Sequence, residues 1–163
     1  MNQPGKNTNP NKDLRIRVTE DEEQLLSGAL SFERKTITSV LLPMHKLITV
    51  PATASPQQIE DVAASTGHSR FPITGNKGQL QGYVHLKDLL AITPAKQNLT
   101  LALKLIRDLP EIRANTSLRN ALFTMQKQGA HLAKVIDPKQ RTLGIVALED
   151  VLEELVGHIR DDA

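Results

Sequence analysis

The sequence predicts an α/β (α+β) fold made of two β-α-β-β-α repeats that pack as a pseudo-twofold pair. The main observation is an internal repeat, because subtracting 62 from each position of 114–152 aligns that segment with 52–90 without a gap. The densest run of matches reads GYVHLKDLL from Gly82 and GIVALEDVL from Gly144. The second copy adds β-branched runs on either side of a turn, and helical apolar stripes. A repeated unit sets the architecture before any single element is considered.

The composition favours a protein that folds without disulfides or a structural metal and does not bind a strongly charged partner. The chain has 163 residues, of which 39% are apolar, enough for one compact domain or two small ones that share a core. Its net charge is only +2 and it has few aromatic residues, which argues against a nucleic-acid partner. The absence of Cys excludes disulfides and thiolate catalysis. With no signal peptide or long apolar segment, the sequence as given predicts a cytoplasmic location.

The N-terminal part is expected to lead into the repeats. Residues 1–18 are polar and rich in Asn and Pro, which is typical of a disordered arm. Thr19 followed by Glu22 has the form of a capping box, and a helix with an apolar stripe then runs to about Phe32. We therefore assign 19–42 to a lead-in helix and linker, 43–98 to the first repeat and 99–160 to the second.

Each repeat is expected to contain a short strand, a helix, two strands joined by a turn, and a second helix. Two helices can cover only one face of a three-stranded sheet, so the repeats should pack sheet to sheet and leave two equivalent crevices where the second helices begin. In the first repeat the elements are expected at Leu47–Val50, Pro56–Thr66, Arg70–Thr74, Leu80–Val84 and Leu86–Ile92.

The second repeat has the stronger local signals. From Leu118, apolar residues stand at i, i+3, i+4 and i+7, which predicts a helix with one buried face. Two β-branched runs flank a turn at Asp137–Lys139. The last helix is predicted by an unbroken apolar stripe of Leu148, Val151, Leu152, Leu155, Val156 and Ile159.

The motifs GYVHLKDLL from Gly82 and GIVALEDVLEELVG from Gly144 resemble the two halves of a tandem CBS-domain pair, also called a Bateman module. The phrases HSRFPI from His68 and LEDVLEELVG from Leu148 more narrowly resemble the CorC/HlyC and CNNM group of magnesium and cobalt transport-associated proteins. The resemblance covers about residues 35–160. Family members commonly carry a membrane domain before the pair. The resemblance therefore implies a membrane-associated parent protein with this part on the cytoplasmic side.

In both motifs a strand that contains a glycine leads into a turn that opens a helix. Free N–H groups at a helix start attract anions, so phosphate is an obvious ligand. The resemblance implies a module that senses an adenine nucleotide (ATP, ADP or AMP), with Mg²⁺ held through the phosphates and no covalent cofactor. In the family pattern, a Ser or Thr meets phosphate and an Asp holds the ribose hydroxyls. The nucleotide-binding residues that it implies here are Asp150, Asp88, His85, Ala147, Arg113, Val135 and Arg70.

The hydroxyl position of the family pattern is changed in both repeats. It is His85 in the first and Ala147 in the second, and Met44 stands where relatives often carry Arg. Ala147 can neither cap the helix nor donate to phosphate, which costs about 1 kcal/mol of capping relative to Thr. His85 can donate, more strongly when it is protonated below its ordinary pKa of about 6.5. These departures leave a second interpretation open, a structural dimerisation module with a degenerate nucleotide site.

Other interpretations of the charged residues are less specific. Asp88 and Asp150 can simply complement the dipole of the helix that each begins. His68 and His131 lack a partner at ligand spacing, and the acidic residues of the last helix are typical of a solvated face, so no metal site is expected. No hydrolase, metalloprotease or nucleotide-phosphate motif is present, so we assign no catalytic residue and expect no enzyme. We expect a homodimer through the helices, including the stripe that ends at Leu155, Val156 and Ile159.

Overall fold

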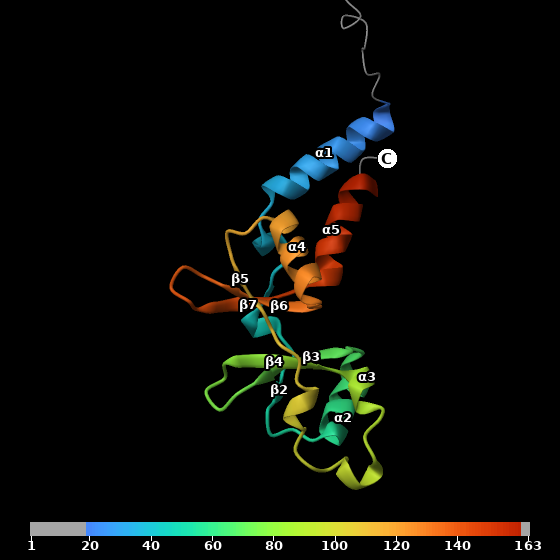
Figure 1. The fold of residues 1–163 in the computed structure, drawn as a ribbon, viewed down its shortest axis with the longest axis vertical. Helices are drawn as coiled ribbons and strands as arrows, with labels where there is room; N and C mark the ends of the chain where they lie inside the picture. The colour runs from blue at the N-terminus through green and yellow to red at the C-terminus, as the bar shows by residue number, and fades with distance from the viewer. Residues whose placement is uncertain (1–18, 161–163) are drawn as a thin grey trace, which may run out of the picture.

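The computed structural model describes residues 19–160, and the predicted arm of residues 1–18 lies outside this part. The described chain forms two β-sheets that are stacked face to face, with helices on their outer sides (Figure 1). Helices α1, α4 and α5 lie on one side, and α2 and α3 lie on the other. The structure confirms the predicted α/β fold with two repeats. No helix of the described chain is long and apolar enough to cross a membrane.

Helix α1 (Glu20–Arg34) begins with the predicted capping box. The Thr19 hydroxyl accepts a hydrogen bond from the Glu22 amide at 3.2 Å, and the Glu22 carboxylate accepts one from the Thr19 amide at 3.3 Å. These two bonds satisfy amides that a helix start otherwise leaves unpaired. The helix ends two residues later than expected and packs against α5 and α4, with Phe32 buried at its inner face.

The first repeat follows the predicted order with two shorter elements. Its second helix ends at Leu89 rather than at Ile92, and the amides of Leu90 and Ile92 bond to carbonyls three residues back, at Lys87 and Leu89. Its first strand is Val50–Pro51 rather than Leu47–Val50, because the preceding 3-10 turn Met44–Lys46 ends only at Leu47. The elements are β2 (Val50–Pro51), α2 (Pro56–Thr66), β3 (Arg70–Thr74), β4 (Leu80–His85) and α3 (Leu86–Leu89).

The second repeat is the more regular of the two. The loop of its hairpin covers residues 137–141, two more than the predicted Asp137–Lys139, and in it the Asp137 amide bonds to the Arg141 carbonyl and Gln140 takes a positive φ of 64°. The elements are β5 (Glu111–Arg113), α4 (Leu118–Gln128), β6 (Leu132–Ile136), β7 (Thr142–Ala147) and α5 (Leu148–Arg160).

Each sheet is completed by a segment that precedes the first strand of the other repeat. Strand β1 (Leu42–Pro43) precedes β2, the first strand of the first repeat, yet it pairs antiparallel with β7 and gives a sheet of order β1-β7-β6-β5. The other sheet has the order β2-β3-β4, and Arg107, which precedes the first strand of the second repeat, forms a bridge to Tyr83 of β4. Leu42 faces Ile145, the residue 62 positions after Tyr83, so Leu42 and Arg107 occupy corresponding places. Neither contact was predicted from the sequence.

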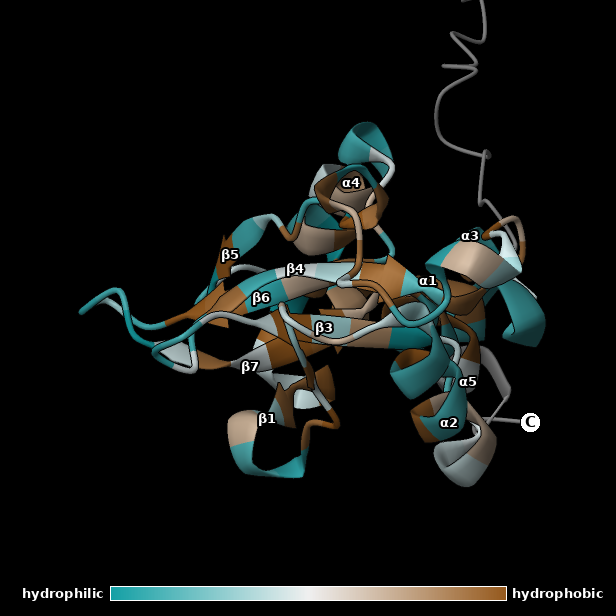
Figure 2. Ribbon diagram, turned by 90° about the horizontal axis from the view of Figure 1, so that it is seen from below, coloured by the Kyte–Doolittle hydropathy of each residue, from teal (hydrophilic) through white to brown (hydrophobic). Residues whose placement is uncertain are grey.

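Three apolar clusters hold the repeats together. One fills the second repeat between its sheet and α4 and α5, and another fills the first repeat. The third lies between the sheets and is formed by Leu80 and Tyr83 of β4 with Leu132 and Ile145. In Figure 2, hydrophobic residues recur along the stacked strands while the hairpin loops at one end are hydrophilic. The predicted sheet-to-sheet packing of the repeats is therefore present.

Replacing Gly144 with Ala is expected to lower the free energy of unfolding by about 1–3 kcal/mol. A Cβ there would collide with the backbone carbonyl of Leu42, which cannot move without breaking the β1–β7 pairing. The matched control is Gly157→Ala in α5, where a Cβ meets no atom within 4 Å and helix propensity should add up to about 1 kcal/mol. Urea unfolding distinguishes the two, and equal effects would contradict the proposed close approach.

Candidate functional site

Two strand-to-helix turns, related by the repeat, lie at the same end of their sheets. We call His85–Asp88, between β4 and α3, the first junction, and Ala147–Asp150, between β7 and α5, the second junction. In each, the first helical amide donates to the loop before the neighbouring strand, with Leu86 bonded to the Ser69 carbonyl at 2.7 Å and Leu148 to the His131 carbonyl at 2.9 Å. Only the later amides of each helix start can therefore serve a ligand.

An ion pair joins the two junctions across the repeats. Arg70 lies beside His85 in the β3–β4 ladder, and its Nη1 donates to Glu149 Oε1 at 3.0 Å. The Arg70 side chain is 23% exposed, whereas that of Glu149 is 67% exposed. Arg70 Nε is buried, and no residue of the described chain accepts its hydrogen bond. Since a buried unpaired donor is costly, this guanidinium is suited to an additional anionic partner.

His85 serves the first junction as a helix cap. Its Nδ1 accepts a hydrogen bond from the Lys87 amide at 3.1 Å, so this nitrogen carries no proton. Burial lowers the pKa of His85 below its ordinary value, and the charges of Arg70 and Arg107 lower it further. A protonated His85 was expected to bind phosphate more strongly, and the lowered pKa means that this protonation occurs at a lower pH than in a free imidazole. Because Nδ1 accepts from the Lys87 amide, only Nε2 can donate to a phosphate.

Asp88 of the first junction is held by a guanidinium. Arg107 Nε donates to one carboxylate oxygen at 2.9 Å and Nη2 to the other at 3.0 Å. These hydrogen bonds are the main reason that the pKa of Asp88 is lowered. Arg107 is itself fixed, because its backbone exchanges hydrogen bonds with Tyr83 at 2.7 and 3.0 Å. A ribose could reach this carboxylate only by displacing a two-point ion pair.

Asp150 of the second junction has no such partner. Leu42 occupies the place that corresponds to Arg107, and no cation of the described chain pairs with Asp150. The pKa of Asp150 is raised, mainly because its carboxyl group is partly desolvated and also because Glu153 and Glu149 lie near it. The two junctions therefore differ chemically, and the expectation of two equivalent crevices is wrong.

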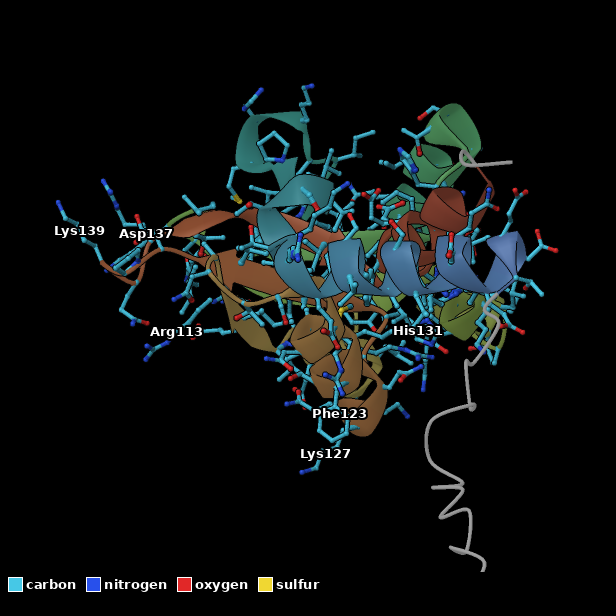
Figure 3. The ribbon with its side chains drawn as sticks, turned by 90° about the horizontal axis from the view of Figure 1, so that it is seen from above. Arg113, Phe123, Lys127, His131, Asp137 and Lys139 are labelled. Atoms are coloured by element: carbon cyan, nitrogen blue, oxygen red, sulfur yellow. The ribbon has the colours of Figure 1, made fainter. Side chains whose placement is uncertain are left out.

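The remaining predicted residues lie in different surroundings. Met44 and Ala147 both pack at the edge of the cluster between the sheets, so the second junction has an apolar wall. Val135 is fully buried in the core of the second repeat, which keeps its side chain away from the junctions. Arg113 faces Ile136 at the opposite end of β6, near Asp137 and Lys139 of the hairpin (Figure 3). The fold thus brings Arg70, His85, Asp88, Ala147 and Asp150 to one end of the sheets and leaves the other two apart.

Arg107 is the functional residue that sequence reasoning missed. It lies in neither of the two aligned segments, so the internal repeat gives no counterpart for it. The 62-residue offset does not find it either, because it pairs Leu42 with Lys104, three residues before Arg107.

Comparison with known protein families matches the CBS domain twice, at residues 37–94 and 103–157. The chain belongs to the CBS domain family. An uncharacterized protein of Mycobacterium tuberculosis is 35% identical over 146 residues, which cover 86% of this chain and 42% of that protein. A hemolysin C homolog of Rickettsia rickettsii is 32% identical over 148 residues, which cover 90% of this chain and 49% of that protein. The CBS pair thus spans less than half the length of these curated relatives.

Solved structures place the fold among transporter CBS domains. The CBS domain of the bacterial CNNM/CorC family Mg²⁺ transporter in complex with ATP matches with a TM-score of 0.77 and 22% identity, over 83% of this chain and 97% of that one. This CBS pair therefore shares the fold of the CNNM/CorC transporter CBS domain and is similar in sequence to hemolysin C homologs, in agreement with the resemblance of its motifs.

Replacing Asp88 with Asn is expected to make the stability of the CBS pair less dependent on acid pH. Because the pKa of folded Asp88 is lowered, its ion pair stabilises the fold above the ordinary Asp pKa of about 3.9, and this is lost as pH falls through the folded pKa. The pair is partly exposed, so the loss at pH 7 should be no more than about 1 kcal/mol.

Urea unfolding of wild type and variant between about pH 7 and pH 3 would measure this dependence. The control is Asp108→Asn, which removes an exposed carboxylate next to Arg107 in sequence. If Asp108→Asn reduced the pH dependence of the unfolding free energy as much as Asp88→Asn, the ion pair of Arg107 with Asp88, which we call the Arg107 clamp, would not be the source of that dependence.

Proposed function

We propose that this CBS pair is a regulatory module that senses an adenine nucleotide at its second junction. The observation that carries the proposal is the contrast between Asp88, which Arg107 holds at both oxygens, and Asp150, which pairs with no cation of the described chain. A carboxylate that is not already paired can accept the hydroxyl groups of a ribose. The ATP in the related CNNM/CorC transporter CBS domain supports the choice of ligand.

The residues of the second junction suit the parts of a nucleotide. Asp150 would accept hydrogen bonds from the ribose, and Met44 with Ala147 offers an apolar surface for the base. Arg70 Nε and the free amides in the first turn of α5 would donate to phosphate oxygens. Among residues 19–160, no group of three or more His, Asp or Glu could hold a metal. We therefore expect Mg²⁺ to enter with the phosphates.

The proposed mechanism is a population shift between arrangements of the two repeats. Arg70 belongs to the first repeat and Asp150 to the second, so a nucleotide that contacts both would favour one arrangement over others. The Arg70–Glu149 pair already links the repeats and would rearrange when phosphate competes for the guanidinium. Since α1 packs on α5, a shift at the second junction reaches the chain before the repeats, where we place a membrane transport domain as partner. The function would be regulatory, with no catalytic step.

A structural dimerisation module is the alternative function, and exposed apolar side chains favour it. Leu152 and Val156 of α5 are exposed, as is Phe123, which points outward from α4 (Figure 3). Leu155 is partly buried, and the side chain of Ile159 lies outside the described residues. We propose that these helices form a homodimer, which is compatible with nucleotide sensing but does not require it.

Thermal unfolding with ATP, ADP and AMP, each with and without Mg²⁺ and at two protein concentrations, tests the proposal. Ligand at about 100 times its Kd adds roughly 2.7 kcal/mol, which raises the midpoint of a chain of this size by about 5–10 °C. A sensor gains this shift from a nucleotide, whereas a dimerisation module gains stability only with protein concentration. If no nucleotide raised the unfolding midpoint, the sensor function would be excluded and the dimerisation module would remain.

A further inference from the structure

A second feature with the properties of a ligand site lies in the first repeat, away from the second junction. It is a cavity of about 340 Å³ between the start of α2, the end of α3 and the loop 90–105. This loop, yellow-green in Figure 1, lies at the end of the molecule opposite α5. Its apolar walls include Pro56, Ile92, Leu99 and Leu105. The volume lies within the range of small-molecule pockets.

The cavity exists because the two repeats fill the corresponding space differently. In the second repeat α5 has 13 residues, and its Leu155 packs on the core together with Phe32 of α1. In the first repeat α3 stops after one turn, and Thr93 stands 62 positions before Leu155. The loop that replaces the helix leaves the space open, and Leu99 lines it while remaining 59% exposed. An occupant with an apolar body would cover this surface.

The walls of the cavity are held in place on both sides. The Leu101 amide donates to the Ala54 carbonyl at 2.9 Å, and the Gln57 amide donates to the Gln97 carbonyl at 3.1 Å. These bonds fix the loop against α2 and the turn before it. On the other side the wall formed by Asp88 is fixed by its ion pair with Arg107. A ligand would therefore enter a preformed site and lose little free energy to ordering it.

The charges around the cavity select the class of ligand. Lys96 and Lys104 line it, and neither forms an ion pair with any carboxylate in the part of the chain that the structure describes. Asp88 is the only acidic residue of the lining, and Arg107 neutralises it. The lining is thus apolar inside and positive at its exposed lysines. We propose that the cavity binds a small amphipathic carboxylate, with its apolar body inside and its carboxylate at Lys96 and Lys104.

Octanoate and the neutral 1-octanol are suitable probes for the complete chain, because they share the alkyl body and differ in charge. We expect octanoate to bind saturably and at least about fivefold more tightly than octanol, with shifts in the amide NMR signals of Ala91, Thr93 and Ala102. Lys96→Gln with Lys104→Gln should remove this preference, and since both lysines are exposed the variant should remain folded. The matched control is Lys77→Gln with Lys127→Gln, two exposed lysines elsewhere.

Three outcomes would overturn the proposal. One is equal affinity for octanoate and octanol, and another is a set of shifted signals along the exposed leucines of α1 rather than around the cavity. The third is displacement of octanoate by ATP, which would make the cavity part of the nucleotide site. Because the binding of octanoate requires no nucleotide, its failure leaves the thermal-shift test of nucleotide sensing unaffected.

Discussion

Replacing Asp150 with Asn is expected to abolish the nucleotide-induced rise in the unfolding midpoint of this CBS pair and, at pH 7, to stabilise the nucleotide-free protein. The first effect follows from the proposed role of the carboxylate, since Asn keeps one acceptor but replaces the charged oxygen by a donor. The wild-type shift of about 5–10 °C at saturating nucleotide should fall to near zero.

The stabilising effect of Asp150→Asn follows from the direction of the pKa shift. Partial burial and the neighbouring carboxylates raise the pKa of folded Asp150. A raised folded pKa stabilises the fold below the ordinary pKa, and this contribution is lost as pH rises through the folded value. At pH 7 the charged carboxylate therefore destabilises the protein, and Asn removes that cost. Unfolding midpoints at pH 7 and at about pH 4 should show the gain at the higher pH only.

Two neighbouring carboxylates provide matched controls for Asp150→Asn. Glu149→Gln removes the adjacent charge and frees Arg70, so nucleotide binding should be retained or strengthened. Asp88→Asn removes the corresponding carboxylate of the first junction and should leave the nucleotide shift unchanged, because Arg107 already occupies it. If Asp88→Asn abolished the shift and Asp150→Asn did not, the nucleotide would bind at the first junction.

The sequence predicted the regular elements because each carries its own local signal. Helix α2 and strand β3 have the expected bounds, since a Ser55 cap and Gly67 delimit the helix and a short apolar run forms the strand. The chemical difference between the junctions has no such signal. It depends on the contact of Arg107 with Asp88, 19 residues apart, and on the placement of Leu42 beside β7. Contacts of this kind arise from the packing of one repeat on the other.

The predicted site residues do not all lie together in the fold. The repeat alignment placed Asp88 and Asp150 in corresponding first turns, as the structure has them. Val135 and Arg113 were carried over from a family pattern, which does not specify whether a side chain faces the core or which end of the strand it occupies. In the structure these two properties separate both residues from the junctions.

Replacing Ala147 with Ser is expected to stabilise the CBS pair by about 1 kcal/mol and to tighten nucleotide binding about tenfold or more. Ala147 immediately precedes α5, so a Ser hydroxyl there can accept from the free amides of the first turn. When nucleotide is bound, the same hydroxyl can donate to a phosphate oxygen, and a hydrogen bond to a charged group is worth about 1.5–3 kcal/mol. Urea unfolding measures the first effect and calorimetric titration with ATP and Mg²⁺ measures the second.

The matched control is His85→Ser, which places the same hydroxyl at the first junction. There the imidazole already caps α3 through Nδ1, so the substitution exchanges one cap for another and should change stability little. It should also leave nucleotide affinity unchanged, since the Arg107 clamp keeps Asp88 from a ribose. A gain in stability without a gain in affinity for Ala147→Ser would mean that phosphate does not reach the start of α5. An equal gain in affinity from His85→Ser would mean that the clamp opens and that both junctions bind nucleotide.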